Sequence, residues 1–341
     1  MSNDKTREWD AIVVGSGMGG MTAAAALSKT GHKVLLLEQY TALGGLTHSF
    51  SREGFSWDVG IHYLGCVAPG DRERALIDWL TNTPMTFEPM GAVYDNLHIG
   101  NAPPLALSRP FEAQERDLKD RFPDEAEAIE AWIAALREGR DLMYTLAPTR
   151  ATPEFVGDMI DWWNRRAIDK WCKRTLQEVV GSITQNPDLA AAFTAQWGDH
   201  GGRPHKASFA MHALVYGCYL TSGAWYPVGG GKSFADHMIP TITQAGGEAR
   251  TGVKVETLLV ENDKVVGVRT SDGEEIRAEV VISNIGARET INNLLPAGFG
   301  PEDWFAEIQS LPPSIAHFSL FLGFEGDVAQ AGATRSNHWF Y

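Results

Sequence analysis

An apolar run and a dense glycine cluster stand near the first residues of the sequence. Residues 10–14 are rich in β-branched side chains, Gly15-Ser16-Gly17-Met18-Gly19-Gly20 follows at once, and residues 21–29 have the composition of a helix. A second apolar run, residues 32–37, ends on Glu38. This order predicts a strand, a tight turn, a helix and a second strand parallel to the first.

The predicted turn has the glycine spacing of a dinucleotide-binding motif. Gly15 permits the tight bend, Gly17 lets the backbone approach a pyrophosphate, and Gly20 allows the helix to pack closely on the strand. The N-terminus of the helix offers N–H groups and a positive dipole end to the phosphates. Glu38 stands where an acid accepts hydrogen bonds from an adenosine ribose and repels a 2′-phosphate. We therefore expect residues 15–20 and Glu38 to bind a nucleotide cofactor.

The middle of the sequence changes to a helical period. Between residues 71 and 222, charged and apolar positions alternate as in helices, and prolines interrupt them. Tryptophans are concentrated there, at Trp79, Trp132, Trp162, Trp163, Trp171 and Trp197. Two interpretations stay open for them: ordinary packing in the core, or the lining of a long apolar cavity. The pattern predicts a helix-rich insert.

Strand-like alternation returns after this insert. Residues 232–244 have the pattern of an amphipathic helix, and three strands are predicted at residues 250–260, 264–270 and 275–282. One more strand is expected at residues 314–324. We expect an α/β fold in which a Rossmann-like nucleotide-binding domain (1–70 and 225–296), with a three-stranded β-meander, encloses a helix-rich substrate domain (71–224 and 297–341).

Composition narrows the classes of function. The 341 residues carry 29 Lys and Arg against 43 Asp and Glu, a net charge of −14, which disfavours nucleic acid as a partner. Cys66, Cys172 and Cys218 lie far apart, so we expect neither a disulfide framework nor a thiolate metal site, and a reducing compartment fits. The sequence shows no signal peptide and no run long enough to span a membrane. We expect a cytoplasmic chain, soluble or peripheral on a membrane.

Two further motifs carry a resemblance to a known family. Leu43-Gly44-Gly45 follows Glu38 closely, and residues 54–60 read Gly-Phe-x-x-Asp-x-Gly. The sequence resembles the flavin-dependent amine oxidase and phytoene desaturase superfamily, in which the glycine pair meets the cofactor and the hairpin returns toward the flavin. Within it, residues 58–65, 196–201, 207–213 and 223–230 look most like the retinol saturases.

This resemblance implies FAD as the cofactor. It adds Gly44, Gly45 and Gly60 to the expected contacts and places the backbone of Val255 against the adenine. Leu46 stands where many carotenoid desaturases have a basic residue. The superfamily also has a second glycine-rich turn, which is absent after Asn284, so we expect a truncated chain that binds FAD weakly and exposes apolar surface around residues 314–341.

The expected reaction needs few titratable groups. No hydrolytic or metal-binding motif is present in the sequence, so no metal is expected and the cofactor must supply the chemistry. The resemblance implies an FAD-dependent oxidoreductase that acts on a C=C bond of a retinoid, carotenoid or similar isoprenoid lipid. Saturation needs a proton, for which His62, Tyr63 and the pair Asp199-His200 are candidates. Each histidine has a purely structural alternative.

Alternatives to this function stay open. A flavin-bound polyene cis–trans isomerase or a non-catalytic lipid carrier would share nearly every motif, and NAD or NADP remains an alternative cofactor or an electron partner. Residues 162–174 combine aromatic groups with a net charge of +4 from Arg165, Arg166, Lys170, Lys173 and Arg174 against Asp169. This segment is the candidate for peripheral membrane contact. The oligomeric state is left open.

Overall fold

The chain divides into two compact units in a computed structural model that describes residues 8–296 and 298–341. The first unit comprises the residues up to His62, Glu73–Phe87 and Pro227–Pro313, and the second comprises Tyr63–Arg72, Glu88–Tyr226 and Ser314–Tyr341. The expected boundaries at 70 and 296 are therefore displaced. Most of α2 (Arg72–Leu80) and all of α12 (Glu302–Ser310) belong to the nucleotide-binding unit rather than to the insert.

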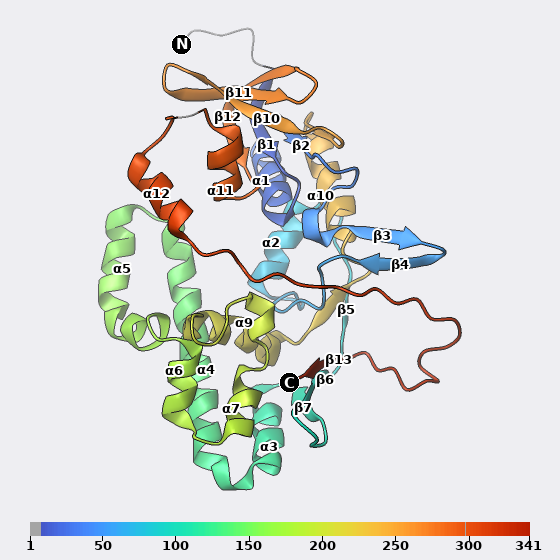
Figure 1. Ribbon diagram of the computed structural model, residues 1–341, viewed down its shortest axis with the longest axis vertical. Coiled ribbons are helices and arrows are strands. Elements are labelled where there is room, and N and C mark those ends of the chain that lie inside the picture. The colour runs from blue at the N-terminus through green and yellow to red at the C-terminus, as the bar shows by residue number, and fades with distance from the viewer. Residues whose placement is uncertain (1–7, 297) are drawn as a thin grey trace. The chain divides into compact units, whose positions relative to one another are not determined.

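A six-stranded sheet forms the centre of the first unit (Figure 1). Its order is β10-β11-β12-β1-β2-β9, with bounds Val255–Glu261, Lys264–Thr270, Glu275–Ser283, Trp9–Val14, Val34–Leu37 and Glu248–Arg250. Strand β1 runs parallel to both β12 and β2, and β2 runs parallel to β9. The other pairs, β10 with β11 and β11 with β12, are antiparallel. The Rossmann-like core and the three-stranded meander are thus confirmed.

Apolar residues of β1 and β2 lie in the core of the first unit. Ile12 and Leu35 are fully buried and pack with the meander residues Leu258 and Val268 in one core cluster. Helix α1 (Met18–Lys29) packs against α10 (Ser233–Gln244), which retains Pro240 in its interior. The remaining elements of this unit are η1 (Gly45–Thr47), β3 (Ser49–Arg52), β4 (Phe55–Asp58), α11 (Ala287–Glu289) and η5 (Thr290–Leu294).

One predicted strand proves to be two. Residues 250–260 were expected as a single strand, but β9 ends at Arg250 and β10 begins at Val255. Between them the backbone bends at Gly252, which has a φ of +72°, and bonds to the segment after β2. The N–H of Gly252 donates to the carbonyl of Tyr40, and that of Val253 donates to the carbonyl of Glu38. These two hydrogen bonds hold the end of β2, where Glu38, the acid expected to bind the cofactor, lies.

The second unit is largely helical, as predicted. Helix α4 (Ala126–Leu146) packs along α9 (Phe209–Ser222), and a Cβ at Gly139 would stand 2.8 Å from the Cβ of Ala213. The other helices are α3 (Phe111–Arg121), η2 (Pro123–Glu125), η3 (Ala147–Ala151), α5 (Glu154–Ala167), η4 (Ile168–Cys172), α6 (Leu176–Ile183), α7 (Pro187–Thr194) and α8 (Trp197–His200). The strands β6 (Val93–His98), β7 (Leu105–Ser108) and β13 (Asn337–Phe340) form a small sheet, and the short β5 (Phe87–Pro89) and β8 (Trp225–Pro227) lie at the unit boundaries.

The tryptophans of the insert divide into two groups. Trp132 is fully buried and stacks on Phe193 with ring centroids 4.4 Å apart, and Trp171 is also buried. These two side chains fill the core of the unit. Trp162 and Trp163, in contrast, project from α5 into solvent.

The strand predicted at residues 314–324 is not formed. The segment has an apolar pattern, but none of the described strands pairs with it, so its backbone stays irregular. Phe318, Leu320 and Phe324 are 95%, 72% and 64% exposed. The expectation of exposed apolar surface in this region is therefore confirmed, and the expectation of a strand is wrong, because a strand requires a hydrogen-bonding partner.

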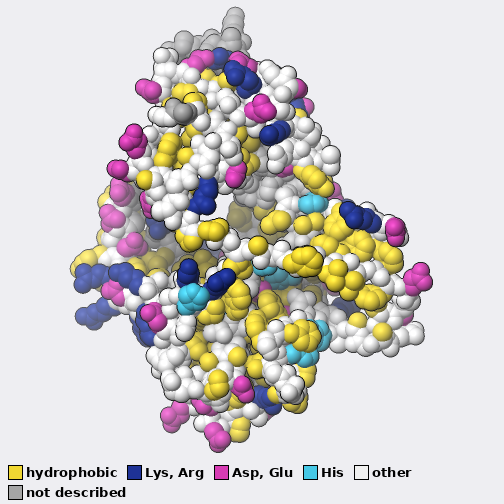
Figure 2. Space-filling model, in the orientation of Figure 1, with side chains coloured by type: hydrophobic (Ala, Val, Ile, Leu, Met, Phe, Trp, Pro, Cys, Tyr) yellow, Lys and Arg dark blue, Asp and Glu magenta, His cyan; other side chains and the backbone are white. Residues whose placement is uncertain are grey.

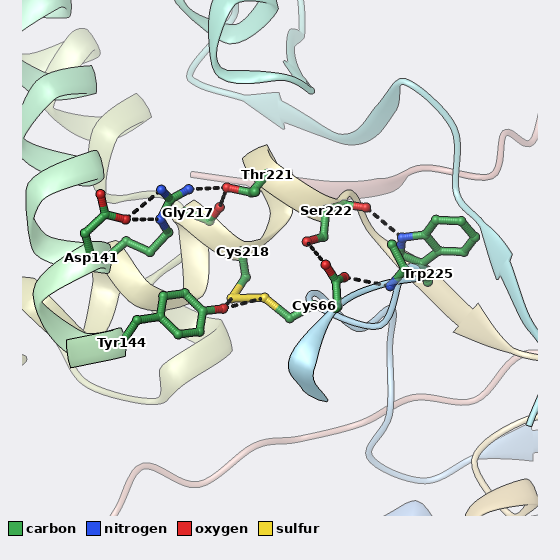
Figure 3. The surroundings of a disulfide bond; sticks show 11 residues. Cys66, Asp141, Tyr144, Gly217, Cys218, Thr221, Ser222 and Trp225 are labelled. Carbon is green, nitrogen blue, oxygen red and sulfur yellow. Dashed lines mark hydrogen bonds and ion pairs between the residues drawn. A yellow bond between two sulfur atoms is a disulfide. The ribbon is translucent and has the colours of Figure 1, made fainter. Parts of the chain in front are cut away.

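The sequence analysis also missed a disulfide bond. Cys66 and Cys218 are 152 residues apart in the sequence but bonded to each other (Figure 3). Cys172 is a free thiol. The bond joins the segment after Tyr63 to α9, and the hydroxyl of Tyr144 lies 3.0 Å and 3.3 Å from the two sulfurs. Separation along the chain was a poor guide, because the fold brings the two cysteines together. The cysteines therefore no longer support a reducing compartment.

Candidate cofactor-binding site

The glycine turn joins β1 to α1 as the motif predicts. Gly15 has a φ of +94°, a conformation that L side chains rarely adopt. A Cβ at Gly20 would stand 1.9 Å from the carbonyl oxygen of Gly15, so a side chain there would push the helix away from the turn. Gly15 is thus explained by backbone conformation and Gly20 by packing.

Gly17 has neither of these reasons to be glycine. It is the N-cap of α1 with a φ of −57°, which any residue adopts. A Cβ at this position would meet only the side-chain nitrogen of Asn284, at 3.2 Å. The neighbouring Gly19 would likewise meet the Asn284 side chain, at 2.6 Å. The missing side chain at Gly17 therefore leaves backbone accessible at a helix N-terminus, which fits the close approach of a pyrophosphate.

The second glycine pair lies against the first turn. Gly17 and Gly44 form a parallel bridge, and a Cβ at Gly45 would stand 2.8 Å from the Cα of Gly17. Gly44 has a φ of +113° and Gly45 a φ of +56°, so both need the conformational freedom of glycine. The two glycine segments, far apart in the sequence, together build a cradle of exposed backbone.

Glu38 ties this cradle together. Its Oε2 accepts hydrogen bonds from the backbone N–H of Ser16 at 2.9 Å and from the Ser16 hydroxyl at 2.7 Å. Its Oε1 accepts one from the N–H of Tyr40 at 2.8 Å. The Ser16 Oγ in turn accepts from the N–H of Gly44 at 3.1 Å. Since a carboxylate oxygen can accept two hydrogen bonds, Oε1 retains capacity for a ribose hydroxyl.

The other expected contacts lie in the same unit. Met18 and Gly19 begin α1, and Val255 begins β10 with a buried side chain. A Cβ at Gly60 would stand 3.1 Å from the Cβ of Leu46, directly after the glycine pair. The fold therefore gathers the predicted cofactor residues within one unit, while their contact with a cofactor stays a prediction.

The turn, the acid and the glycine pair agree with a comparison of the whole chain against known families. Residues 18–339 match the family described as flavin containing amine oxidoreductase. The chain belongs to this family. Its residues fit a flavin nucleotide at the cradle, since Gly17 and the helix N-terminus suit the pyrophosphate and Glu38 suits the ribose.

Several proteins resemble this chain along most of its length. An all-trans-retinol 13,14-reductase of Danio rerio is 34% identical, over 97% of this chain and 56% of that protein. A chloroplastic prolycopene isomerase of Daucus carota is 27% identical, over 95% of this chain and 54% of that protein. The chain thus spans about half the length of these curated relatives.

Solved structures resemble it in fold. The crystal structure of an oxidoreductase from Methanosarcina mazei superposes with a TM-score of 0.62 at 20% identity, covering 89% of this chain and 65% of that one. This likeness concerns the fold alone. The retinoid and carotenoid relatives agree with the resemblance seen in the sequence motifs.

The three proposed proton donors lie in different surroundings. His62 ends the first of the three segments that form the first unit, two positions after Gly60, and burial lowers the pKa of its imidazole. Tyr63 is buried in the second unit, where its hydroxyl donates to Asp95 Oδ2 at 2.5 Å and accepts from Gln196 Nε2 at 3.1 Å. Burial and the charge of Asp95 raise the pKa of this phenol well above its ordinary value, so it stays protonated.

His200 belongs to a chain of hydrogen bonds whose direction can be assigned. The Nε2 of buried His212 lies 3.1 Å from the carbonyl of Phe193, which can only accept, so His212 donates there. Its Nδ1 then accepts from His200 Nε2 at 3.1 Å, and His200 Nδ1 accepts from the N–H of Gly202 at 3.3 Å. Both ring nitrogens of His200 therefore hold structural hydrogen bonds.

Two acids of the second unit, Asp95 and Asp199, lie largely buried, and the sequence analysis named only Asp199. Gln196 Nε2 donates to Asp95 Oδ2 at 2.8 Å beside the bond from Tyr63, and burial raises the pKa of Asp95 to about 6. Burial and the charge of Asp95 raise the pKa of Asp199 to about 7. Asp95 lies in a polar run on β6, and no sequence signal distinguished it from a surface residue. Burial therefore favours the protonated form of both carboxyls inside the second unit.

No group of three or more His, Cys, Asp or Glu side chains among residues 8–296 and 298–341 is placed to hold a metal ion. Within the same ranges, no helix combines the length and apolarity needed to cross a bilayer.

Proposed function

We propose that this chain binds FAD and carries the activity of an oxidoreductase that acts on a C=C bond of a retinoid, carotenoid or similar isoprenoid. The observation that carries the proposal is the cradle of Gly17, Gly44 and Gly45 closed by Glu38, in a chain of the flavin amine oxidoreductase family. Similarity to a retinol 13,14-reductase along 97% of the chain supports the substrate class.

The protein contributes binding, orientation and a proton. A flavin bound at the cradle would supply the hydride for saturation, or would accept one for desaturation. Glu38 orients the ribose, and the N-terminus of α1 holds the pyrophosphate. Because a carboxylate repels a 2′-phosphate, Glu38 favours FAD or NAD over NADP as the nucleotide bound at the cradle.

We rank His62 first among the candidate proton donors. It follows the β3–β4 hairpin and stands two residues after Gly60, which contacts the segment of the glycine pair. Burial lowers the pKa of its imidazole, so the protonated ring is a stronger acid and a better proton donor, while the neutral ring dominates at pH 7. Exchange of His62 for Gln should lower the rate of C=C reduction by about 10²–10⁴-fold.

The reaction is tested by following the mass of the product. The chain is incubated anaerobically with photoreduced FAD and all-trans-retinol or a C40 polyene, and the organic extract is examined by mass spectrometry. A reductase adds two hydrogens to one C=C bond, one as a hydride, which the reduced flavin would supply and so be oxidised, and one as a proton. A product heavier by two mass units supports the proposal.

An isomerase is the second candidate, favoured by the similarity to a prolycopene isomerase. It would yield a product of unchanged mass and altered retention time. If FAD binds but the polyene changes neither its mass nor its geometry, both catalytic proposals fail and a lipid carrier remains.

A further inference from the structure

Helix α5 exposes a stripe of large apolar side chains. Phe155, Met159, Trp162 and Trp163 are 72%, 60%, 68% and 80% exposed. Their spacing of i, i+4, i+7 and i+8 places them along one side of the helix. A surface helix normally turns such a stripe toward the core, but α5 has no buried residue. We call these four side chains the α5 face.

Basic residues gather where this helix ends. Arg165, Arg166 and Lys170 are exposed, and Lys173 and Arg174 follow them. Figure 2 shows Lys and Arg side chains clustered at the left edge of the molecule, where α5 ends. The acids of α5, Glu154, Asp158 and Asp161, stand in its earlier part and lie to one side of the stripe at 100° per residue. A cationic cluster in a chain of net charge −14 is a local reversal of sign.

Part of the segment expected to contact a membrane has its apolar side chains packed in the core rather than exposed. Of residues 162–174, Trp171 is buried, and Ile168 and Cys172 pack against the core of the second unit. The Trp171 indole donates to Glu138, and Lys170 lies over its ring. The apolar groups available to a partner are therefore Trp162 and Trp163 of the expected segment, together with Phe155 and Met159, which precede it.

We propose that the α5 face docks on an anionic lipid surface. Tryptophan is favoured at the level of the lipid headgroups, and phenylalanine and methionine reach the acyl boundary below it. Arg165 and Arg166, at the end of the same helix, stand where they attract lipid phosphates. An acidic protein partner would be served by the cations, but it would leave four large apolar groups without an apolar counterpart. A bilayer of anionic lipid matches both features.

The test uses vesicles and needs neither flavin nor polyene, so its failure leaves the proposed enzymatic function untouched. The full chain is centrifuged with vesicles of phosphatidylcholine alone and with vesicles that contain phosphatidylglycerol. We expect binding to the anionic vesicles that weakens as salt is raised. Lipids brominated in the upper acyl chain should quench tryptophan fluorescence in the native chain and not after exchange of Trp162 and Trp163 for Phe.

Two variants are compared with matched controls. Exchange of Arg165 and Arg166 for Glu should lower vesicle affinity at least about tenfold, while the same charge change at exposed Lys254 and Lys264 should leave it unchanged. Exchange of Phe155 and Trp162 for Ser should also abolish binding. Exchange of Phe318 and Leu320 for Ser removes comparable exposed apolar groups elsewhere, and should have no such effect.

Three results would overturn the proposal. The first is absence of binding to anionic vesicles by the native chain. The second is binding that survives both α5 variants, or that is lost equally in the Phe318 and Leu320 control. The third is self-association in sedimentation velocity that disappears only in the α5 variants, since this would assign the face to a second copy of the chain. Circular dichroism verifies that each variant is folded.

Discussion

Ser16 connects the parts of the site at the scale of single residues. Its backbone and hydroxyl both donate to Glu38, and its hydroxyl oxygen accepts from Gly44. One small side chain therefore joins the first glycine turn, the acid after β2 and the glycine pair. These contacts lie within the chain itself, so Ser16 and Glu38 together fix the backbone of the cradle.

Exchange of Glu38 for Gln should weaken the first unit. The amide would place an N–H₂ group against donors of Ser16 or Tyr40, leaving a buried donor unsatisfied at a cost of about 1–3 kcal/mol. A lower midpoint of urea unfolding is expected. Exchange of the exposed Glu279 for Gln is the matched control. Equal midpoints for the two variants would show that the Glu38 hydrogen bonds contribute nothing to stability.

Asp199 should make the stability of the second unit depend on pH. Its pKa is about 7 in the folded chain and near 3.8 when unfolded, so its proton stabilises the fold. This contribution is complete below pH 3.8 and is lost as the pH rises through 7. Buried His212, whose pKa is lowered to about 3, acts in the opposite sense below pH 6.5. Between pH 6.5 and 8, the change of unfolding free energy with pH is therefore expected to come mainly from Asp199.

The Asp199→Asn variant isolates this effect. On lowering the pH from 8 to 6.5, the native chain should gain unfolding free energy relative to the variant, as measured by urea titration at each pH. His200, whose pKa is lowered by burial, and His212 are present in both proteins, so their contributions cancel. If the difference in unfolding free energy between the two proteins does not change with pH, Asp199 does not carry a buried proton.

At the scale of elements, the patterns predicted well where local periodicity decides the structure. The strand, turn and helix around Gly15, the meander and α10 follow from the order of apolar and glycine positions. The pattern failed at residues 314–324, where strand formation depends on a partner rather than on the segment itself. It also failed at Gly252, where contacts with Tyr40 and Glu38 divide one apparent strand into two.

The disulfide between Cys66 and Cys218 should stabilise the second unit. It closes a loop across 152 residues of sequence, and such a long constraint on the unfolded chain contributes about 2–5 kcal/mol. The unreduced chain, denatured without reductant, should react with a thiol reagent at Cys172 alone, and at all three cysteines after reduction. Reduction should lower the unfolding midpoint.

The control is exchange of Cys172 for Ser, which should leave the effect of reduction on the midpoint intact. Three reactive thiols in the unreduced, denatured chain would contradict the bond. The segment that the disulfide fixes is held by other contacts as well. Leu64 and Trp225 exchange backbone hydrogen bonds, and the Trp225 indole donates to the carbonyl of Ser222 (Figure 3). Reduction is therefore expected to loosen this segment without unfolding it.

At the scale of the whole molecule, the sequence predicted the nucleotide-binding fold more fully than the side-chain network of the second unit. Glycine turns and a terminal acid are local motifs, so residues 15–20, Glu38 and Gly44 could be recognised one after another. The Tyr63, Asp95 and Gln196 network joins three distant segments, and only the fold brings these side chains together. For the same reason the disulfide and the true position of Trp171 could not be predicted.

Binding of FAD to the cradle is the central claim, and a titration tests it most directly. Quenching of flavin fluorescence gives the Kd for the native chain, for Gly17→Val and for the control Gly181→Val, whose added Cβ meets no atom within 4 Å. We predict that Gly17→Val, still folded by circular dichroism, raises the Kd at least about a hundredfold, because its side chain occupies the space of the pyrophosphate. The control should bind as the native chain does. Equal affinity of all three proteins for FAD would contradict the account.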